Sequence, residues 1–311
     1  MKWKVMVSAP YMKQEIEKFR SWFKEHDIEI DVPDVKERME EGDLLPVISE
    51  YDGVVCGDDR FTENVYKAAK KLKVVSKWGT GIDSIHKDIA EKYGVKVYNT
   101  PDAFSHPVSD TVIGYMLSFS RNILPSDKMM KSGLWEKIKG KTLGEQTLGI
   151  IGCGNVGIRV AKKANAFGMR ILTYDVKAIE PPVLEQYCIE QTSLDALLET
   201  ADFISLNCDL NESSYHILSH EAFRKMKRTA IVINTARGPV IDEAALVAAL
   251  KGKLIGGCAL DVFEQEPLPI DSPLRQMDNV ILSSHNSNSS PMYWEKVHIN
   301  TLNNLLRGLQ N

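Results

Sequence analysis

The chain alternates short β-rich runs with amphipathic segments of helical period, and this alternation constrains its fold more than any other feature. A strand that is followed by a helix can pair in parallel with the next strand, because the helix returns the chain to the starting end of the sheet. The pattern therefore predicts an α/β fold with parallel sheets. The expected strands are KVMVSA, IEIDV, GVVCG, KVVSKW and VKVYN in a first series, and LGIIG, RILTYD, YCIE, DFISLN, AIVIN, GGCALD and NVILSS in a second.

The two series predict two doubly wound parallel-sheet domains, which suits a length of 311 residues. We expect one domain over residues 1–99, completed by the C-terminal segment 286–311, and the other over 100–285. Residues 105–122 are typical of a long helix that could link the two. The last helix is expected to pack on the first sheet through Trp294, Val297, Ile299, Leu302 and Leu305.

Charge and cysteine content narrow the range of partners. A net charge of -4 provides no basic surface for nucleic acid or an anionic membrane. No apolar run approaches the roughly 20 residues of a membrane span, and the amino terminus lacks a signal-peptide pattern. The five cysteines are scattered without C-x-x-C spacing, which disfavours a disulfide framework and a zinc site. We therefore expect a cytoplasmic protein with no nucleic-acid or membrane partner and no metal.

The strongest local motif is a glycine-rich turn between a predicted strand and a predicted helix. Gly152, Gly154 and Gly157 form G-x-G-x-x-G, and Asp175 ends the next strand 18 residues after the last glycine. Three glycines can simply mark turns. In this context they suit a tight turn, a close approach of pyrophosphate to the backbone and close helix packing. Asp175 would bind the adenosine ribose hydroxyls and repel a 2′-phosphate, so NAD is the predicted cofactor, although Lys177 is nearby.

The ends of the later strands carry the residue types that an alcohol–carbonyl interconversion needs. Arg237 follows one strand, Asp261, Glu264 and Glu266 follow the next, and His285 follows the last. A guanidinium in a cleft needs an anion, such as a substrate carboxylate. An imidazole can move the hydroxyl proton, and a carboxylate can keep that imidazole protonated. A lone histidine at a strand end is more often packed or solvated, but this order of groups favours a catalytic interpretation.

These segments together resemble the D-isomer specific 2-hydroxyacid dehydrogenases, in the branch of D-3-phosphoglycerate dehydrogenase. The resemblance runs over nearly the whole chain, through GTGIDSI, NTP, WEKIKGKTLGEQTLGIIGCGNVG, NTARGPVIDEAAL and GGCALDVFEQEPL. It implies a flavodoxin-like substrate domain and a Rossmann NAD-binding domain. It also implies an enzyme that interconverts a D-2-hydroxy acid and its 2-oxo acid, and a homodimer formed through the NAD domain by helix 105–122 and the segment after it.

The resemblance assigns roles position by position. The implied catalytic residues are Arg237, Glu266 and His285, with Glu266 preferred to Glu264 because it directly precedes the proline. The implied cofactor contacts are Thr80, Gly152, Gly154, Asn155, Val156, Gly157, Asp175, Cys208, Thr235, Ala236 and Asp261, the last through the nicotinamide carboxamide. The expected substrate contacts are Gly79, Thr80, Gly81 and Arg237, with Arg60 as a further candidate.

Three departures from the family pattern bear on the substrate. The catalytic histidine is usually followed by an apolar residue and glycine, whereas HNSNSS stands here. A usual His-x-Pro-Leu pattern is replaced by NCDL at 207–210. The arginine of phosphoglycerate dehydrogenases is replaced by Cys56, which makes small unphosphorylated 2-oxo acids the expected substrates. Arg60 could anchor a phosphate or pair with Asp58 and Asp59 at the surface.

Two alternatives stay open at this point. Lys77 and Trp78 precede the glycine loop and either contact the substrate or belong to the packing. A non-enzymatic NAD(H) sensor is the alternative function, because transcriptional corepressors share this fold and much of the triad. The compact chain lacks the extra tails expected of such a regulator, which favours the enzyme.

Overall fold

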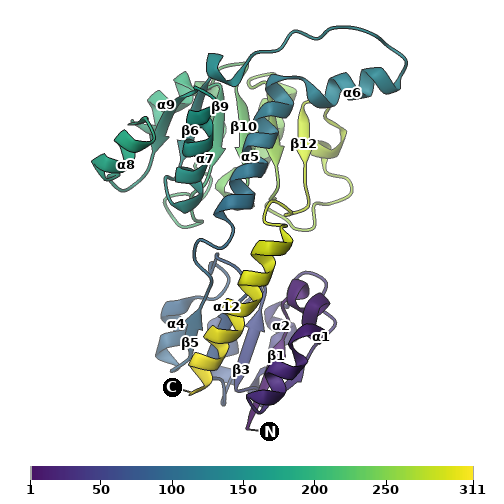
Figure 1. Cartoon of the computed structure of the whole chain (residues 1–311), viewed down its shortest axis with the longest axis vertical. Helices are drawn as coiled ribbons and strands as arrows, with labels where there is room; N and C mark the ends of the chain where they lie inside the picture. The colour runs from purple at the N-terminus through teal and green to yellow at the C-terminus, as the bar shows by residue number, and fades with distance from the viewer. Residues whose placement is uncertain (1, 311) are drawn as a thin grey trace. The chain divides into compact units, whose positions relative to one another are not determined.

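The computed structural model describes residues 2–310, which form two compact units. The first unit contains the chain up to Phe104 and from Ser290 onward, and the second spans Ser105–Ser289. Each unit is a parallel sheet with flanking helices (Figure 1). The domain boundaries expected from the sequence, after residues 99 and 285, stay a prediction. Across the described residues, each of the twelve expected strands is present.

The first unit has five parallel strands in the order β2-β1-β3-β4-β5, which is the flavodoxin-like order. The strands are β1 (Trp3–Val7), β2 (Ile28–Asp31), β3 (Gly53–Cys56), β4 (Val74–Lys77) and β5 (Lys96–Tyr98). The helices are α1 (Pro10–Glu25), α2 (Glu41–Leu44), η1 (Ile48–Glu50), α3 (Glu63–Ala68), α4 (Lys87–Lys92) and α12 (Pro291–Gln310).

Helix α12 packs on the sheet of the first unit, as its apolar positions predict. The hydroxyl of Ser76 in β4 donates to the carbonyl of Thr301 at 2.8 Å. Gly308 brings the helix so close that a Cβ there would lie 2.3 Å from a methyl of Val74. The expectation for Ile299 was wrong, because its side chain is 48% exposed. It stands two residues after the buried Val297, which places it on the opposite side of the helix.

The second unit has seven parallel strands in the order β12-β11-β10-β9-β6-β7-β8. The strands are β6 (Thr147–Ile151), β7 (Arg170–Tyr174), β8 (Ile189–Gln191), β9 (Phe203–Leu206), β10 (Ile231–Asn234), β11 (Gly257–Leu260) and β12 (Val280–Leu282). The helices are α5 (Ser105–Ser120), α6 (Ile123–Lys131), η2 (Leu143–Glu145), α7 (Asn155–Ala166), α8 (Pro181–Gln186), α9 (Leu194–Thr200), α10 (His220–Lys225), η3 (Gly238–Val240), α11 (Glu243–Lys251) and η4 (Pro273–Gln276).

The strand order of the second unit determines where a ligand can bind. From β6 the chain first adds β7 and β8 on one side and then crosses to β9 on the other, so the topology reverses beside β6. In open α/β sheets ligands bind at the carboxyl ends of the strands next to such a reversal. All four residues of β9, β10 and β11 are buried, which suits a sheet covered on both faces. The Rossmann prediction is confirmed.

The helix expected over 105–122 ends two residues early. Helix α5 stops at Ser120, and Asn122 adopts a left-handed conformation with φ of 51° before α6 begins. Helix α5 packs against α7 within the second unit. In the described part of the chain, no helix combines the length and the apolar character needed to cross a bilayer.

Candidate active site

The glycine-rich turn after β6 has the geometry of a nucleotide-binding loop. Gly152 has φ of 88°, and a Cβ there would lie 2.6 Å from the backbone nitrogen of Cys208 after β9. A Cβ on Gly157 would lie 2.3 Å from the carbonyl oxygen of Gly152. These two glycines are therefore required by the protein's own packing. A Cβ on Gly154 would meet no protein atom within 4 Å, so the backbone is open there, as the close approach of a pyrophosphate requires.

Helix α7 begins immediately after this open glycine. Gly154 is its N-cap residue and offers no side-chain cap. The first backbone N–H groups of a helix lack intrahelical acceptors, and the helix dipole adds positive potential there. For a helix of 12 residues this end is suited to a pyrophosphate. Asn155 and Val156 are the first two residues of the helix, so their N–H groups are the first of these, and their contact with a cofactor stays a prediction.

Asp175 is held against the same loop. Its Oδ2 accepts the backbone N–H of Cys153 at 2.8 Å, and its Oδ1 accepts that of Lys177 at 2.9 Å. Each carboxylate oxygen keeps a further lone pair for a ribose hydroxyl. Burial raises the pKa of the Cys153 thiol, so this cysteine serves the turn as a small neutral side chain rather than a thiolate.

The remaining expected cofactor contacts of the second unit follow β9, β10 and β11. Cys208 packs against the glycine turn, and the buried hydroxyl of Thr235 has no hydrogen-bond partner among the described residues. A buried hydroxyl without a partner is costly, so a bound cofactor could supply one. Ala236 follows directly. The open glycine, the helix terminus and this hydroxyl together fit a dinucleotide at the edge where one is expected.

Arg237 lies in a turn that is held by the buried side-chain amide of Asn234. Asn234, the last residue of β10, accepts the N–H of Ala236 at 3.0 Å and donates to the carbonyl of Arg237 at 2.9 Å. Arg237 itself has an extended backbone, and one guanidinium nitrogen donates to the carbonyl of Ala236 at 2.9 Å. The amide thus fixes the direction in which the arginine leaves the sheet edge.

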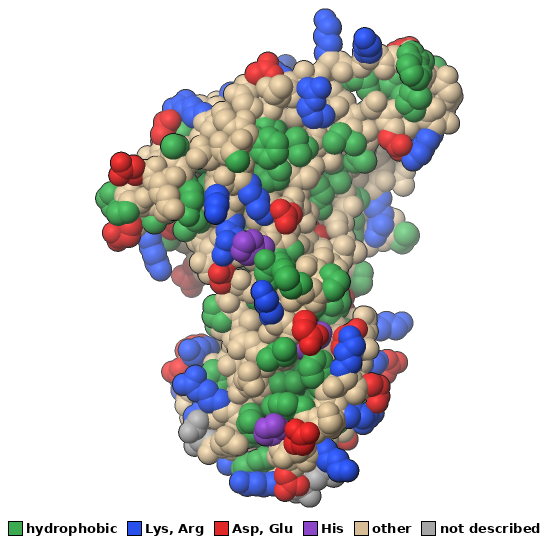
Figure 2. Space-filling model, in the orientation of Figure 1, with side chains coloured by type: hydrophobic (Ala, Val, Ile, Leu, Met, Phe, Trp, Pro, Cys, Tyr) green, Lys and Arg blue, Asp and Glu red, His purple; other side chains and the backbone are tan. Residues whose placement is uncertain are grey.

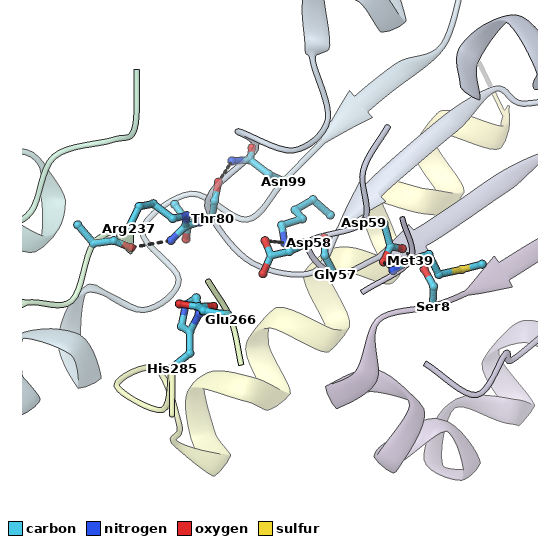
Figure 3. Close-up of polar contacts among 12 residues, drawn as sticks. Ser8, Met39, Gly57, Asp58, Asp59, Thr80, Asn99, Arg237, Glu266 and His285 are labelled. Carbon is cyan, nitrogen blue, oxygen red and sulfur yellow. Dashed lines mark hydrogen bonds and ion pairs between the residues drawn. The ribbon is translucent and has the colours of Figure 1, made fainter. Parts of the chain in front are cut away.

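Glu266 and His285 lie side by side (Figure 3). Imidazole Nδ1 and carboxylate Oε2 are 3.0 Å apart, and both side chains are about three-quarters buried. The other carboxylate oxygen accepts the N–H of Phe263 at 2.9 Å. The contact with Glu266 uses Nδ1, which fixes the orientation of the imidazole ring.

Asp261 supports the loop that carries the histidine. Its carbonyl accepts the N–H of His285 at 2.8 Å, and its carboxylate accepts the N–H groups of Asn286 and Ser287 at 2.8 and 2.9 Å. The side chain is fully buried. This holds the polar HNSNSS segment in place. The expected contact between Asp261 and the nicotinamide carboxamide stays a prediction.

Two features near Glu266 and His285 had no signal in the sequence. Glu264, which was set aside in favour of Glu266, pairs instead with His216 at 2.7 Å. A Cβ on Gly238 would lie only 1.9 Å from the backbone carbonyl of Phe263. Both contacts join segments that are distant in sequence, and neither residue stands in a motif that predicts the other.

Among the described residues no group of three or more potential metal ligands is found.

The glycine loop of the first unit is held by hydrogen bonds to Asn99 and Thr100. Gly79 has φ of 120°, and its carbonyl accepts the N–H of Thr100 at 2.9 Å. The hydroxyl of Thr80 donates to the carbonyl of Thr100 at 2.9 Å, and the Asn99 amide donates to the carbonyl of Thr80 at 2.5 Å. The roles of Gly79, Thr80 and Gly81 toward cofactor and substrate stay predictions.

The residues just before this loop are packed. The ammonium of Lys77 is almost fully buried and donates to the Gly57 carbonyl at 2.6 Å and to Asp58 at 2.7 Å. The indole N–H of Trp78 donates to Nδ1 of the buried His298 at 2.9 Å. Burial lowers the pKa of His298, consistent with a neutral acceptor. The packing alternative for Trp78 therefore agrees with the structure.

Comparison with known proteins agrees with this geometry. The profile of the family "D-isomer specific 2-hydroxyacid dehydrogenase, NAD binding domain" matches residues 113–287. A glyoxylate reductase of Thermofilum pendens is 40% identical over 78% of this chain and 74% of its own length. A hydroxypyruvate reductase of Thermotoga maritima is 38% identical over 88% and 90%. A D-3-phosphoglycerate dehydrogenase of Methanocaldococcus jannaschii is 40% identical over 82% of this chain but 47% of its own length.

A solved structure extends the comparison to the fold. The D-lactate dehydrogenase of Aquifex aeolicus, complexed with NAD and lactic acid, superposes with a TM-score of 0.85. It is 25% identical, and the match covers 96% of this chain and 93% of that one. The match to the family profile, the relatives and the fold are mutually consistent. The chain belongs to the D-isomer specific 2-hydroxyacid dehydrogenase family and is an NAD-dependent oxidoreductase that acts on a CH–OH group.

Proposed function

We propose that this enzyme interconverts small, unphosphorylated 2-oxo acids of the glyoxylate or hydroxypyruvate kind with their D-2-hydroxy acids. The hydrogen bond between Glu266 and His285 is the observation that carries the chemical part of the proposal. A fixed imidazole–carboxylate pair at the sheet edge beside a nucleotide loop suits proton transfer to or from a hydroxyl oxygen.

Each residue then has a defined task. The Arg237 guanidinium binds the substrate carboxylate in a bidentate geometry and polarises the adjacent carbonyl. His285 gives or takes the hydroxyl proton through the nitrogen that Glu266 does not engage, and the negative charge of Glu266 favours the imidazolium form. When bound, NAD(H) supplies or accepts the hydride.

The preference for unphosphorylated acids is supported by the contacts of Lys77 in the first unit. A phosphate needs its own cationic site. Lys77 is already engaged by Asp58 and a carbonyl, and Asp59 is fully buried, where it binds the Ser8 hydroxyl and the N–H of Met39 (Figure 3). Asp58 and Asp59 thus have other partners, and no described contact pairs Arg60 with either of them, so Arg60 stays the candidate phosphate anchor that the test below addresses.

The substrate proposal is tested by turnover with a panel of 2-oxo acids and NADH. We expect glyoxylate or hydroxypyruvate to give a kcat/KM at least equal to that of 3-phosphohydroxypyruvate, and Arg60→Ala to change these values less than about threefold. Arg38→Ala, which removes another partly exposed arginine of this unit, is the control. A strong preference for the phosphorylated acid that collapses in Arg60→Ala would identify Arg60 as a phosphate anchor. Tight NADH binding without turnover of any acid would favour the sensor.

The choice of NAD is tested at Asp175. We expect Asp175→Ala to weaken NADH binding by roughly tenfold to a hundredfold, because hydrogen bonds to a charged group are lost. The same change should reduce discrimination against NADPH, because a negative charge facing the 2′-phosphate disappears. Dissociation constants for both cofactors can be measured by fluorescence titration. Asp195→Ala, at an exposed ion pair of the same unit, is the control. A wild type that already prefers NADPH would contradict this assignment.

We propose a homodimer that forms through the second unit by the helix expected over 105–122 and the segment after it, which includes α6. Ile123, Leu124, Met130, Leu134 and Trp135 are all at least 49% exposed, with Trp135 at 85%. Figure 2 shows apolar side chains gathered at the upper right, over α6 and the segment after it. A contiguous exposed apolar surface commonly marks an interface.

The oligomer is tested by light scattering on the wild type and on a Leu134→Ser, Trp135→Ser double variant. We expect the wild type to have about twice the mass of the chain and the double variant to shift toward the monomer. Ile270→Ser, which changes a side chain that is 87% exposed elsewhere, should leave the mass unchanged. A monomeric wild type would rule out the dimer.

A further inference from the structure

The loop that carries Glu266 is tied to the rest of the second unit by a second imidazole–carboxylate pair. Nε2 of His216 lies 2.7 Å from Oε1 of Glu264, and roughly a third of each side chain is exposed. The backbone of His216 is itself fixed, because its N–H donates to the carbonyl of Pro239 at 2.9 Å. Leu218, two residues on, forms a parallel bridge with Ile241. His216 is therefore anchored to the segment that directly follows Arg237.

Glu264 is held from a second direction by helix α11. Its N–H donates to the Glu243 carboxylate at 3.2 Å, and the Glu243 N–H points back to Oε1 of Glu264 at 3.4 Å. Burial raises the pKa of Glu243, and the charge of Glu264 adds to that rise. Two neighbouring carboxylates repel each other, and the imidazole of His216 provides the group that can offset this repulsion.

This attachment reaches Glu266 through a single residue, Phe263. The carbonyl of Phe263 packs against Gly238, and the N–H of Phe263 donates to Glu266 at 2.9 Å. Glu264 is the residue next to Phe263, so holding Glu264 fixes the donor that orients the catalytic carboxylate. The other oxygen of that carboxylate then faces His285 at 3.0 Å.

We propose that His216 and Glu264 form a positioning pair for the Glu266–His285 couple. Their described side-chain hydrogen bonds are with each other and with the N–H of Glu243, not with Glu266 or His285. Their task is to keep the 263–266 turn in place, so that Glu266 retains both the Phe263 N–H and the imidazole. The proposal rests on the roles proposed above for Glu266 and His285.

The test compares His216→Ala, His216→Gln and the control His220→Ala, which removes an exposed histidine four residues away. We expect His216→Ala to lower kcat for the best 2-oxo acid by about tenfold, since small misplacements of catalytic groups are costly. The dissociation constant of NADH should stay within about twofold, because the cofactor loop is not involved. His216→Gln can still donate to Glu264 and should recover most of kcat. His220→Ala should match the wild type.

A spectroscopic readout separates positioning from general damage. In cofactor-free protein, the pH titration of the His285 ring followed by NMR should move to lower pH in His216→Ala and return toward the wild type in His216→Gln. The carboxylates that the described contacts place around His285 are Glu266 and Asp261. An unchanged kcat and titration in His216→Ala would overturn the proposal. So would a loss of kcat in which His216→Gln gives no recovery. A wild type without turnover of any 2-oxo acid would instead count against the proposed function, and the NMR comparison would still decide the positioning role.

Discussion

His285→Ala is expected to lower kcat by about a hundredfold to ten-thousandfold, which is the usual contribution of general acid–base catalysis. The substitution removes the group proposed to give or take the hydroxyl proton and leaves Glu266 without its imidazole partner. The nucleotide loop, Asp175 and Thr235 are untouched, so the dissociation constant of NADH should stay within about twofold. Steady-state kinetics with the best 2-oxo acid and a fluorescence titration of NADH measure the two quantities.

A second substitution, at Glu266, tests how much the carboxylate charge contributes. Glu266→Gln keeps an oxygen that can accept from the imidazole or from Phe263, but it removes the charge that favours the imidazolium. Its kcat should lie between those of the wild type and His285→Ala. Wild-type kcat in His285→Ala would remove this histidine from the mechanism. Equal loss of NADH binding and of kcat would indicate that it holds the cofactor site instead.

The sequence was sufficient for the architecture because parallel α/β units carry strong local signals. Strands buried on both faces appear as short apolar runs, and turn residues separate them from helices. The order of these runs, with the glycine turn after β6, placed Arg237, Glu266 and His285 at strand ends of a single sheet. The pairing of Glu266 with His285 follows the expectation taken from the proline that comes after Glu266.

What the sequence did not predict depends on contacts between distant, partly exposed segments. His216 and Glu264 stand 48 positions apart, and polar side chains at a surface follow no periodic pattern. Ile299 was misassigned because apolar character alone does not identify the buried face of a helix. The helix expected to end at 122 stops earlier, because Asn122 takes a left-handed backbone conformation that composition did not reveal.

Gly238 is the clearest case of a residue whose importance only the fold reveals. It follows Arg237 and belongs to η3, and its backbone lies against the loop that carries Glu266. An added Cβ would stand 1.9 Å from both the carbon and the oxygen of the Phe263 carbonyl, and 2.4 Å from the nitrogen of Glu264. Carbon atoms in contact are normally about 3.5 Å or more apart. The obstructing atoms are backbone, so no rotamer change can relieve the overlap.

Gly238→Ala should therefore separate the arginine turn from the glutamate loop by more than about 1 Å and reduce kcat by about a hundredfold, since a misplacement of that size is known to be this costly. Overpacking of this kind should also lower the free energy of unfolding by about 1–3 kcal/mol, measurable by urea denaturation. Gly42→Ala is the matched control, because a Cβ there meets no atom within 4 Å. NADH binding should persist in both variants, because the turn after β6 is not part of the contact. If Gly238→Ala keeps wild-type kcat, the contact between these two loops does not position Glu266.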